Sequence, residues 1–245
     1  MTTPDVTLLM TRPLSAAERF VSALPPEGQA RVSVCYSPLM RIETVGAPPH
    51  YDGAAGVIFT SSNGVSAAGR APATALACFC VGEATTRIAR HMGWAAQNAG
   101  ATADELIATL TLRNPAGPLL HLRGAHSRGD VAGNLSRAGI ETREQVVYDQ
   151  KLQPLSEAAL AALAGTAPVI VPLFSPRTAR QFADQAQVRA PLWIAALSEN
   201  VAEEAKSLKY NTLETCSTPD APAMAGLVVD MLNRLTRVES GADSH

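Results

Sequence analysis

The chain has 245 residues, of which 47% are hydrophobic, and a formal net charge of -2 at neutral pH. This length and hydrophobic content suffice for one large or two ordinary folded domains and exclude a disordered chain. The small net charge, without any run of Lys or Arg, excludes a surface that follows nucleic-acid phosphates, and no apolar stretch is long enough to span a membrane.

The N-terminal segment and the cysteines indicate a reducing compartment. Residues 1–10 lack the basic and apolar regions of a signal peptide. The spacing of the cysteines is not that of a zinc site, because Cys78 and Cys80 occupy alternate positions of one expected strand. We therefore expect idle or buried thiols and a cytoplasmic protein. The four cysteines are Cys35, Cys78, Cys80 and Cys216.

The first predicted elements are a strand, a helix and a second strand. Ser15 and Glu18 have the spacing of a capping box at a helix start, and Pro25 and Pro26 end that helix. We expect a strand at 7–11, a helix from about 15 to 24, a strand at 31–36 and an extended connector over 37–49.

Apolar strands and helices then alternate, which is typical of a parallel sheet with both faces covered. Thr102 and Glu105 form a second capping box. The expected strands lie near 56–60, 77–81, 118–122 and 144–148, and the expected helices lie near 63–70, 84–92, 104–112 and 128–138.

A second strand-helix series follows a polar extended stretch at 149–155. Thr218 and Pro219 are a suitable N-cap and first residue for the last helix. We expect helices at 156–164, 177–187, 199–208 and 219–235, strands at 168–174 and 192–197, and a frayed tail from 238.

Counting strands predicts that one domain is inserted into the other. Residues 119–124 give the middle block a strand that ends in Arg-Gly, and the last block lacks such an element, which residues 8–13 can supply. The prediction is an α/β fold of two flavodoxin-like parallel-sheet domains, joined by a two-stranded β-ladder and separated by a cleft. The predicted domains are 1–36 with 152–237 and 42–146, the linker strands 37–41 and 147–151, and the tail 238–245.

Small polar residues recur where strands lead into helices. In open parallel sheets ligands bind at the carboxyl ends of strands, and free N–H groups at helix starts attract anions. Each hydroxyl or amide can also be a plain helix cap. Glu83 and Glu199 would oppose an anion, and we interpret them as structural. The turn residues are Ser61, Ser62 and Asn63; Gly82, Glu83 and Thr85; Ser175, Pro176 and Arg177; and Ser198, Glu199 and Asn200.

Motifs for other chemistries are missing from the sequence. No Gly-x-Gly-x-x-Gly, phosphate-binding P-loop or His-Glu-x-x-His occurs, which argues against dinucleotide enzymes and zinc hydrolases. The histidines show no ligand spacing, and His121 is interpreted as a core or rim residue within a strand.

In the order and spacing of its motifs, nearly the whole chain resembles the uroporphyrinogen-III synthase family. The resemblance implies two α/β domains, no metal or organic cofactor, and hydroxymethylbilane as the substrate. We expect a monomeric enzyme, with a possible hand-off from hydroxymethylbilane synthase. The motifs are Leu9-Met10-Thr11-Arg12-Pro13, Ile58-Phe59-Thr60-Ser61, Val81-Gly82-Glu83-Ala84-Thr85, Leu122-Arg123-Gly124, Val147-Tyr148, Phe174-Ser175-Pro176 and Leu197-Ser198 leading into Val201-Ala202.

The implied reaction is cyclisation of the linear tetrapyrrole with loss of water and inversion of ring D, giving uroporphyrinogen III for heme, siroheme, cobalamin and chlorophyll-type pathways. Tyr148, which matches the tyrosine of the family's Val-Tyr motif, is the candidate proton donor to the departing hydroxyl, and packing between domains is its alternative role. Asn200 stands where Thr is frequent in the family, so its side-chain contact is in doubt. The candidate substrate-binding residues are Arg12, Thr60, Ser61, Ser62, Gly82, Thr85, Arg123, Gly124, Ser175, Arg177, Ser198 and Asn200, with Arg128 as a further cation.

Two other functions fit the same pattern of elements. A two-lobed small-molecule binding or sensor protein would need the same cleft, although no export signal supports it. A regulatory module of flavodoxin-like halves would present a phosphorylatable Asp in an acidic cluster at a strand end, and neither 59–61 nor 174–176 provides one.

Overall fold

The computed structural model describes the backbone of residues 6–72, 76–126 and 129–242, and side chains as far as residue 235. The chain divides into two compact units. Unit 1 comprises Met1–Arg41 and Leu152–His245, and unit 2 comprises Ile42–Lys151. Each unit is an α/β structure built on its own sheet, so the predicted fold class of two parallel-sheet bodies is confirmed.

The sheet of unit 1, sheet A, has the strand order β11-β10-β9-β1-β2 within the described residues, and the pairings in it are parallel. Its strands are β1 (Val6–Met10), β2 (Val32–Tyr36), β9 (Val169–Leu173), β10 (Leu192–Ala196) and β11 (Thr212–Thr215). The helices of unit 1 are α1 (Leu14–Ser22), α2 (Pro26–Gln29), α7 (Glu157–Ala164), α8 (Pro176–Gln185), α9 (Glu199–Ala205) and α10 (Ala221–Ala242).

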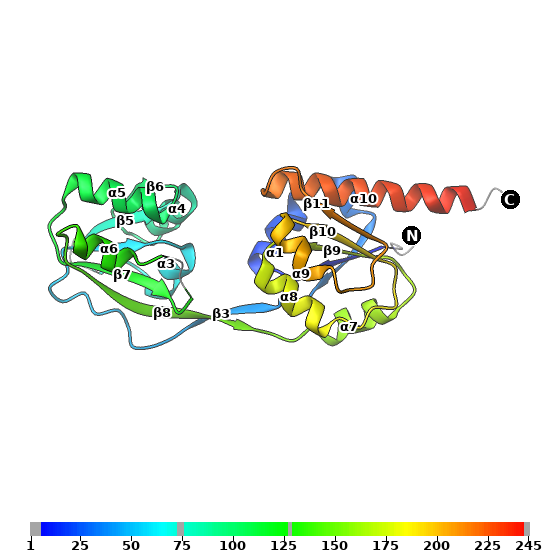
Figure 1. Ribbon diagram of the computed structural model, residues 1–245, viewed down its shortest axis with the longest axis horizontal. Helices are drawn as coiled ribbons and strands as arrows, with labels where there is room; N and C mark the ends of the chain where they lie inside the picture. Colours follow the sequence, from blue (N-terminus) through cyan, green and yellow to red (C-terminus); the bar gives the residue numbers. More distant parts are fainter. Residues whose placement is uncertain (1–5, 73–75, 127–128, 243–245) are drawn as a thin grey trace. The chain divides into compact units, whose positions relative to one another are not determined.

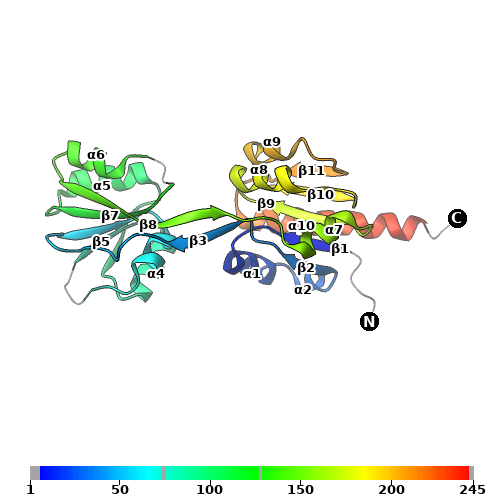
Figure 2. The ribbon, with the colours of Figure 1, turned by 90° about the horizontal axis from the view of Figure 1, so that it is seen from below.

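Both faces of sheet A are covered by helices, because apolar residues occupy successive strand positions that point to opposite faces. Leu9 packs with α7, α8 and α9 on one face. Leu8 and Met10 pack with α1 and α10 on the other. Figure 2 shows α8 and α9 on one side of the sheet and α1 and α2 on the opposite side. The predicted buried strand series of this unit is therefore confirmed.

Sheet B, in unit 2, has the order β3-β8-β7-β4-β5-β6 in the described part of the chain. Its strands are β3 (Met40–Thr44), β4 (Gly56–Phe59), β5 (Ala77–Val81), β6 (Ala96–Gly100), β7 (Leu119–Gly124) and β8 (Thr142–Leu152). The helices of unit 2 are α3 (Ser62–Ala68), α4 (Glu83–His91), α5 (Ala103–Arg113) and α6 (Val131–Arg137).

Sheet B also lies between two helical layers. Val57 and Phe59 pack with residues of α3 and α4, whereas Ile58 packs with α5 and α6. In Figure 2, α5 and α6 lie on one side of this sheet and α4 on the other. Trp94 anchors the first layer through an edge-on contact with the Phe59 ring and an N–H donated to the Gly69 carbonyl at 3.0 Å.

The chain passes between the units twice, within β3 and within β8 (Figure 1). These strands pair with each other in sheet B. Val45 donates its N–H to Val147 at 3.0 Å, and Gln153 donates its N–H to Leu39 at 2.9 Å. Residue numbers on the first strand increase while those of their partners on the second strand decrease, so the ladder is antiparallel. The segment at 40–44, which lies within the predicted extended connector and overlaps the predicted linker strand at 37–41, is therefore a strand.

Several predicted helix boundaries are wrong. Helix α1 begins at Leu14 after Pro13, without a side-chain cap, so Ser15 does not form the predicted capping box. The prolines at 25 and 26 start the short helix α2. The last helix begins at Ala221, where Asp220 accepts the Ala223 N–H at 2.8 Å, and it continues to Ala242 through the predicted frayed tail. The predicted cap at Thr102 is confirmed, since its hydroxyl accepts the Glu105 N–H at 3.2 Å.

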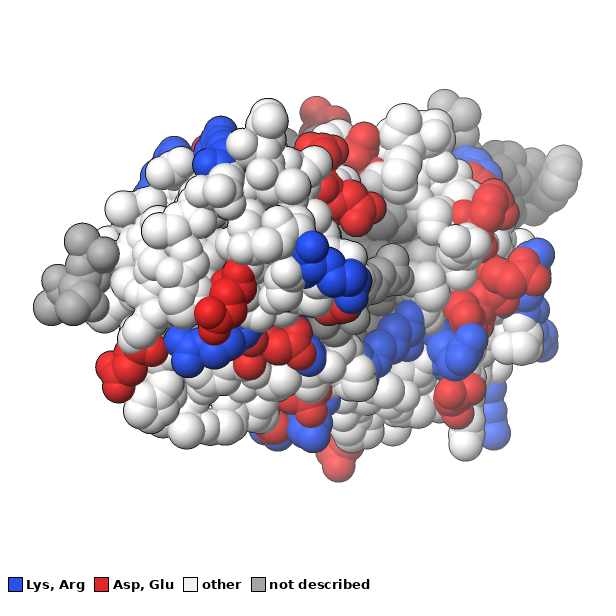
Figure 3. Space-filling view, turned by 60° about the vertical axis from the view of Figure 1, so that its left-hand side comes forward, with Lys and Arg blue, Asp and Glu red and all other residues white. Residues whose placement is uncertain are grey.

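On the face shown in Figure 3, basic and acidic side chains of the described residues are interspersed, and neither kind forms an extended patch. This matches the small net charge of -2. We also find, among the described helices, none with both the length and the apolar character needed to cross a membrane.

Candidate active site

The residues predicted as a site in unit 2 follow neighbouring strands of sheet B. Strand β4 lies between β5 and β7, and β8 pairs with β7. Parallel strands end at the same edge of a sheet, so the residues at their carboxyl ends are brought together there. They are Thr60, Ser61 and Ser62 after β4, Gly82 and Thr85 after β5, Arg123 and Gly124 at the end of β7, and Tyr148 in β8.

The two helix starts at this edge are built differently. The Ser61 hydroxyl caps α3 by accepting the Asn63 N–H at 3.1 Å. The N-cap of α4 is Gly82, whose φ of 78° is in the left-handed region that favours glycine, and no side chain among the described residues caps this helix start. Thr85 lies in the first turn of α4 and is buried. Without a side-chain cap, the start of α4 leaves more backbone N–H groups available than the start of α3, but the Glu83 carboxylate in its first turn opposes an anion.

His121 supports the hydroxyl of Thr60. Its Nε2 atom lies 3.2 Å from the Thr60 Oγ1 atom, because Ile58 pairs in register with His121 and Thr60 follows two residues later. The ring is 2% exposed, and its Nδ1 atom has no hydrogen-bond partner among the described residues. Burial lowers the pKa of His121 to about 4, so the ring is neutral at pH 7. The prediction of a core or rim histidine is confirmed, but the sequence does not indicate this contact with a hydroxyl group.

Arg123 is already engaged by groups of its own unit. Its guanidinium donates to the Glu144 carboxylate at 2.5 Å and to the Gly124 carbonyl at 2.9 Å. The Arg123 hydrogen bond holds the pKa of Glu144 below its usual value. A substrate carboxylate would compete with Glu144 for this arginine, so we expect Arg123 mainly to hold the end of β7.

Gly124 and Tyr148 are in direct contact. They pair in register between β7 and β8, and Ala125 donates its N–H to the Tyr148 carbonyl at 2.8 Å. A Cβ atom at Gly124 would lie 2.6 Å from Tyr148 Cζ and 2.9 Å from its hydroxyl oxygen. The Tyr148 residue is 5% exposed. Only glycine at position 124 leaves room for the phenol ring in this place.

The predicted residues of unit 1 follow β1, β9 and β10, which are neighbours in sheet A. Arg12 follows β1, Ser175 and Arg177 follow β9, and Ser198 and Asn200 follow β10. The Ser175 hydroxyl caps α8 by accepting the Thr178 N–H at 3.3 Å, whereas Ser198 makes no side-chain cap. Asn200 is exposed and Arg177 half-buried. Arg128 lies outside the described residues.

Arg12 lies in a groove with a second arginine that the sequence did not indicate. Its guanidinium carbon lies 4.0 Å from the centre of the Phe174 ring. Arg19, on α1, lines the same groove. No local signal marks Arg19, because an exposed arginine on an amphipathic helix is ordinary. Its relation to Arg12 depends on the turn between β1 and α1.

Metal-ligating residues are not gathered anywhere in the described structure, where no group of three or more His, Cys, Asp or Glu is placed to hold an ion. All four cysteines are free thiols.

The fold and these sites define a class: an α/β protein with two parallel-dominated sheets, each presenting helix starts and hydroxyl groups at its carboxyl edge. Comparison with protein-family models identifies the family. The model described as uroporphyrinogen-III synthase HemD matches residues 27–226, and the chain belongs to the uroporphyrinogen-III synthase family. Membership implies a lyase of tetrapyrrole synthesis and supports this function over a non-enzymatic two-lobed binding protein.

A solved structure with low sequence identity shares the fold. Uroporphyrinogen-III synthetase from Helicobacter pylori is 15% identical, with a TM-score of 0.65, and the match covers 92% of this chain and 99% of that one. A mutant uroporphyrinogen III synthase from Thermus thermophilus is 14% identical, with a TM-score of 0.49 and coverage of 94% and 99%. A sequence comparison with curated proteins finds no match.

Proposed function

We propose that the protein is a uroporphyrinogen-III synthase, which closes linear hydroxymethylbilane into uroporphyrinogen III with loss of water and inversion of ring D. The family match over residues 27–226 carries this proposal. The helix starts and arginines at the two sheet edges support it, because the substrate carries acetate and propionate arms on every ring.

The chemistry requires control of shape more than a reactive cofactor. Protonation lets the terminal hydroxyl leave as water, and the remaining azafulvene is electron-poor. The substituted carbon of ring D attacks it to give a spiro intermediate, which then rearranges to the inverted ring. Unassisted closure gives the symmetric type I isomer, so the enzyme's main contribution is to hold the pyrroles in one conformation.

The proposed contacts divide between the units. In unit 2, substrate carboxylates would be held by Thr60, Ser61, Ser62 and the backbone from Gly82 to Thr85. Gly124 would leave room for Tyr148. In unit 1, Arg12, Ser175, Arg177, Ser198 and the backbone at Asn200 would do so. The single-residue roles are modest, since positioning energy is spread over many hydrogen bonds.

The direct test of the proposed function is the isomer that forms. Purified protein is incubated with hydroxymethylbilane, the products are oxidised to porphyrins, and the type I and type III isomers are separated by chromatography. We expect the type III isomer to dominate. A protein that only binds the linear tetrapyrrole would leave type I as the main product, and that outcome would refute the proposal.

Tyr148→Phe tests the proposed proton donor. The ring remains beside Gly124, so we expect the free energy of unfolding to change by less than about 1 kcal/mol. General acid assistance is worth about 100-fold or more, and turnover should fall by about that factor. Initial rates of type III formation and thermal unfolding are measured together. Turnover close to that of the wild type would leave the phenol hydroxyl without an essential part.

We also infer a cytoplasmic, monomeric enzyme. Four free cysteines are typical of a reducing compartment. Because the linear substrate closes to the wrong isomer unaided, delivery directly from hydroxymethylbilane synthase would raise the yield of type III product. Mixing the two proteins should then give more type III isomer than the same amounts separated by a dialysis membrane.

A further inference from the structure

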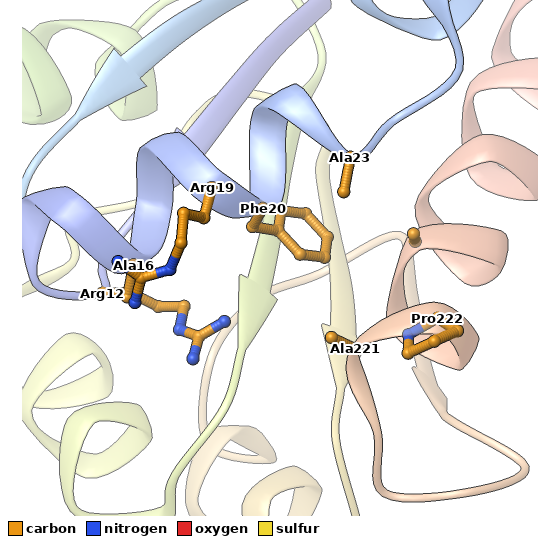
Figure 4. Close-up of a pocket in the computed structure, with 8 residues that line it drawn as sticks. Arg12, Ala16, Arg19, Phe20, Ala23, Ala221 and Pro222 are labelled. Atoms are coloured by element: carbon orange, nitrogen blue, oxygen red, sulfur yellow. The ribbon is translucent and has the colours of Figure 1, made fainter. Parts of the chain in front are cut away.

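A groove in unit 1 lies between helix α1 and the start of helix α10. Its volume is about 390 Å³, which is in the range of small-molecule sites. Figure 4 shows the side chains of Arg12 and Arg19 together below α1, with the Phe20 ring beside them and Pro222 across the groove. Small residues of both helices complete the lining, and they are Ala16, Ala23, Ala221 and Ala225.

Two positive charges share this groove, and the described residues supply no counter-ion to them. Within the described part of the chain, no carboxylate lies within 4.0 Å of the guanidinium nitrogens of Arg12 or Arg19. Asp220, at the start of α10, has its carboxylate occupied by the Ala223 N–H at 2.8 Å and the Thr218 hydroxyl at 2.9 Å. Burial and the charge of Arg19 both lower the pKa of Arg12. Like charges held together in a partly desolvated groove favour binding of an anion.

The rest of the groove favours a flat apolar ring. Phe20 is 4% exposed, and its ring meets the edge of Phe174 with centroids 5.3 Å apart. Phe174 in turn lies beneath the Arg12 guanidinium, and this contact holds the cation next to the apolar part of the groove. Alanine and proline side chains leave open volume instead of filling it. A ligand that matches both halves of the groove is a small aromatic ring with carboxylate arms.

We propose that this groove binds one carboxylate-bearing pyrrole ring, with Arg12 and Arg19 paired to its carboxylates and the ring against Phe20 and Pro222. The proposal rests on the proposed function for the identity of the ring, and it adds Arg19 and the α1–α10 groove as the place where unit 1 recognises it. Arginine suits this role because its planar donors match a carboxylate in two-point contacts.

The test is calorimetric titration of the full chain with a monopyrrole that carries one acetate and one propionate arm. We expect binding by the wild type, and Arg19→Ala and Arg12→Ala should each weaken it about tenfold, as expected for loss of a hydrogen bond to a charged group. Arg113→Ala is the matched control, since it removes an exposed arginine of unit 2 and should leave the affinity unchanged. The dimethyl ester of the probe, which lacks negative charge, should not bind.

The outcomes separate this proposal from the proposed function. Failure of the wild type to bind the monopyrrole, or equal affinity in Arg19→Ala and Arg113→Ala, would overturn the groove as a pyrrole site even if type III product still forms. Arg19 is exposed, so its replacement should not prevent folding. With hydroxymethylbilane, Arg19→Ala should raise KM with little change in kcat, whereas failure of the proposed function would show as type I product from the wild type.

Discussion

Replacing Gly124 with alanine is expected to displace the Tyr148 ring and to lower the free energy of unfolding of unit 2 by about 2 kcal/mol. The new Cβ atom would lie 2.6 Å from Tyr148 Cζ and 2.7 Å from its Cε2. The two backbones are held together here by the register pair of Gly124 with Tyr148 and by the Ala125 N–H, which is donated to the Tyr148 carbonyl at 2.8 Å. The buried ring must therefore leave its place. If Tyr148 is the proton donor, type III formation should fall at least about as far as in Tyr148→Phe.

The stability change can be assigned to unit 2 by fluorescence. The chain has two tryptophans, and Trp94 is buried in unit 2 whereas Trp193 belongs to sheet A. In a Trp193→Phe background, Trp94 alone reports denaturant unfolding. Gly226→Ala, in helix α10 of unit 1, is the control for a glycine replacement outside unit 2, because a Cβ atom there meets nothing within 4 Å. In an exposed helical position it should be neutral or slightly stabilising.

A double-mutant cycle identifies the cause. When Tyr148 is first changed to alanine, the added methyl group at position 124 has no ring to meet, and its cost should fall to a few tenths of a kcal/mol. An equal cost of Gly124→Ala with and without the Tyr148 ring would show that the contact is not responsible.

Buried elements are the ones that the sequence predicts most directly. Strands such as β4 and β9 are buried along their whole length, so their apolar runs predict them directly. The sequence does not predict strands β6 and β11, and both are sheet edges. Gln97 and Asn98 of β6 are exposed. An edge strand needs hydrogen bonding on one side only and can carry polar residues, so it leaves little trace in hydrophobicity.

The candidate site likewise contains some features that the sequence predicts and others that it does not. Helix starts at Ser61 and Ser175 were predictable because a cap is a local arrangement of a hydroxyl and a nearby N–H. The engagement of Arg123 by Glu144 joins residues on neighbouring strands, and its geometry depends on the register of β7 with β8. The contact between His121 and Thr60 likewise depends on the pairing of β4 with β7. Such contacts follow from tertiary structure, which residue patterns alone do not specify.

Acid should destabilise unit 2 through His121, and His121→Gln should remove most of that effect. Burial is the main cause that lowers the pKa of His121 from 6.5 to about 4; Glu144 raises it and Arg123 lowers it. Above pH 6.5 the ring is neutral in both the folded and the unfolded chain. As the pH falls below 6.5 the unfolded chain takes up a proton that the folded chain does not, so stability decreases until about pH 4. At 1.36 kcal/mol for each pH unit, the loss across this window is about 3 kcal/mol.

The pH range in which stability is lost distinguishes the effect of His121 from that of the carboxylates. Glu144, whose pKa is lowered chiefly by its hydrogen bond from Arg123, loses its stabilising contribution only as the pH falls below 4.5. Denaturant unfolding of unit 2, followed by Trp94 fluorescence in the Trp193→Phe background, is measured between pH 7 and 4.5. The wild type should lose stability steadily, whereas His121→Gln should stay nearly level. His91→Gln, at an exposed position at the end of α4, should follow the wild type. Parallel pH profiles for His121→Gln and the wild type would mean that this ring is not the group that titrates.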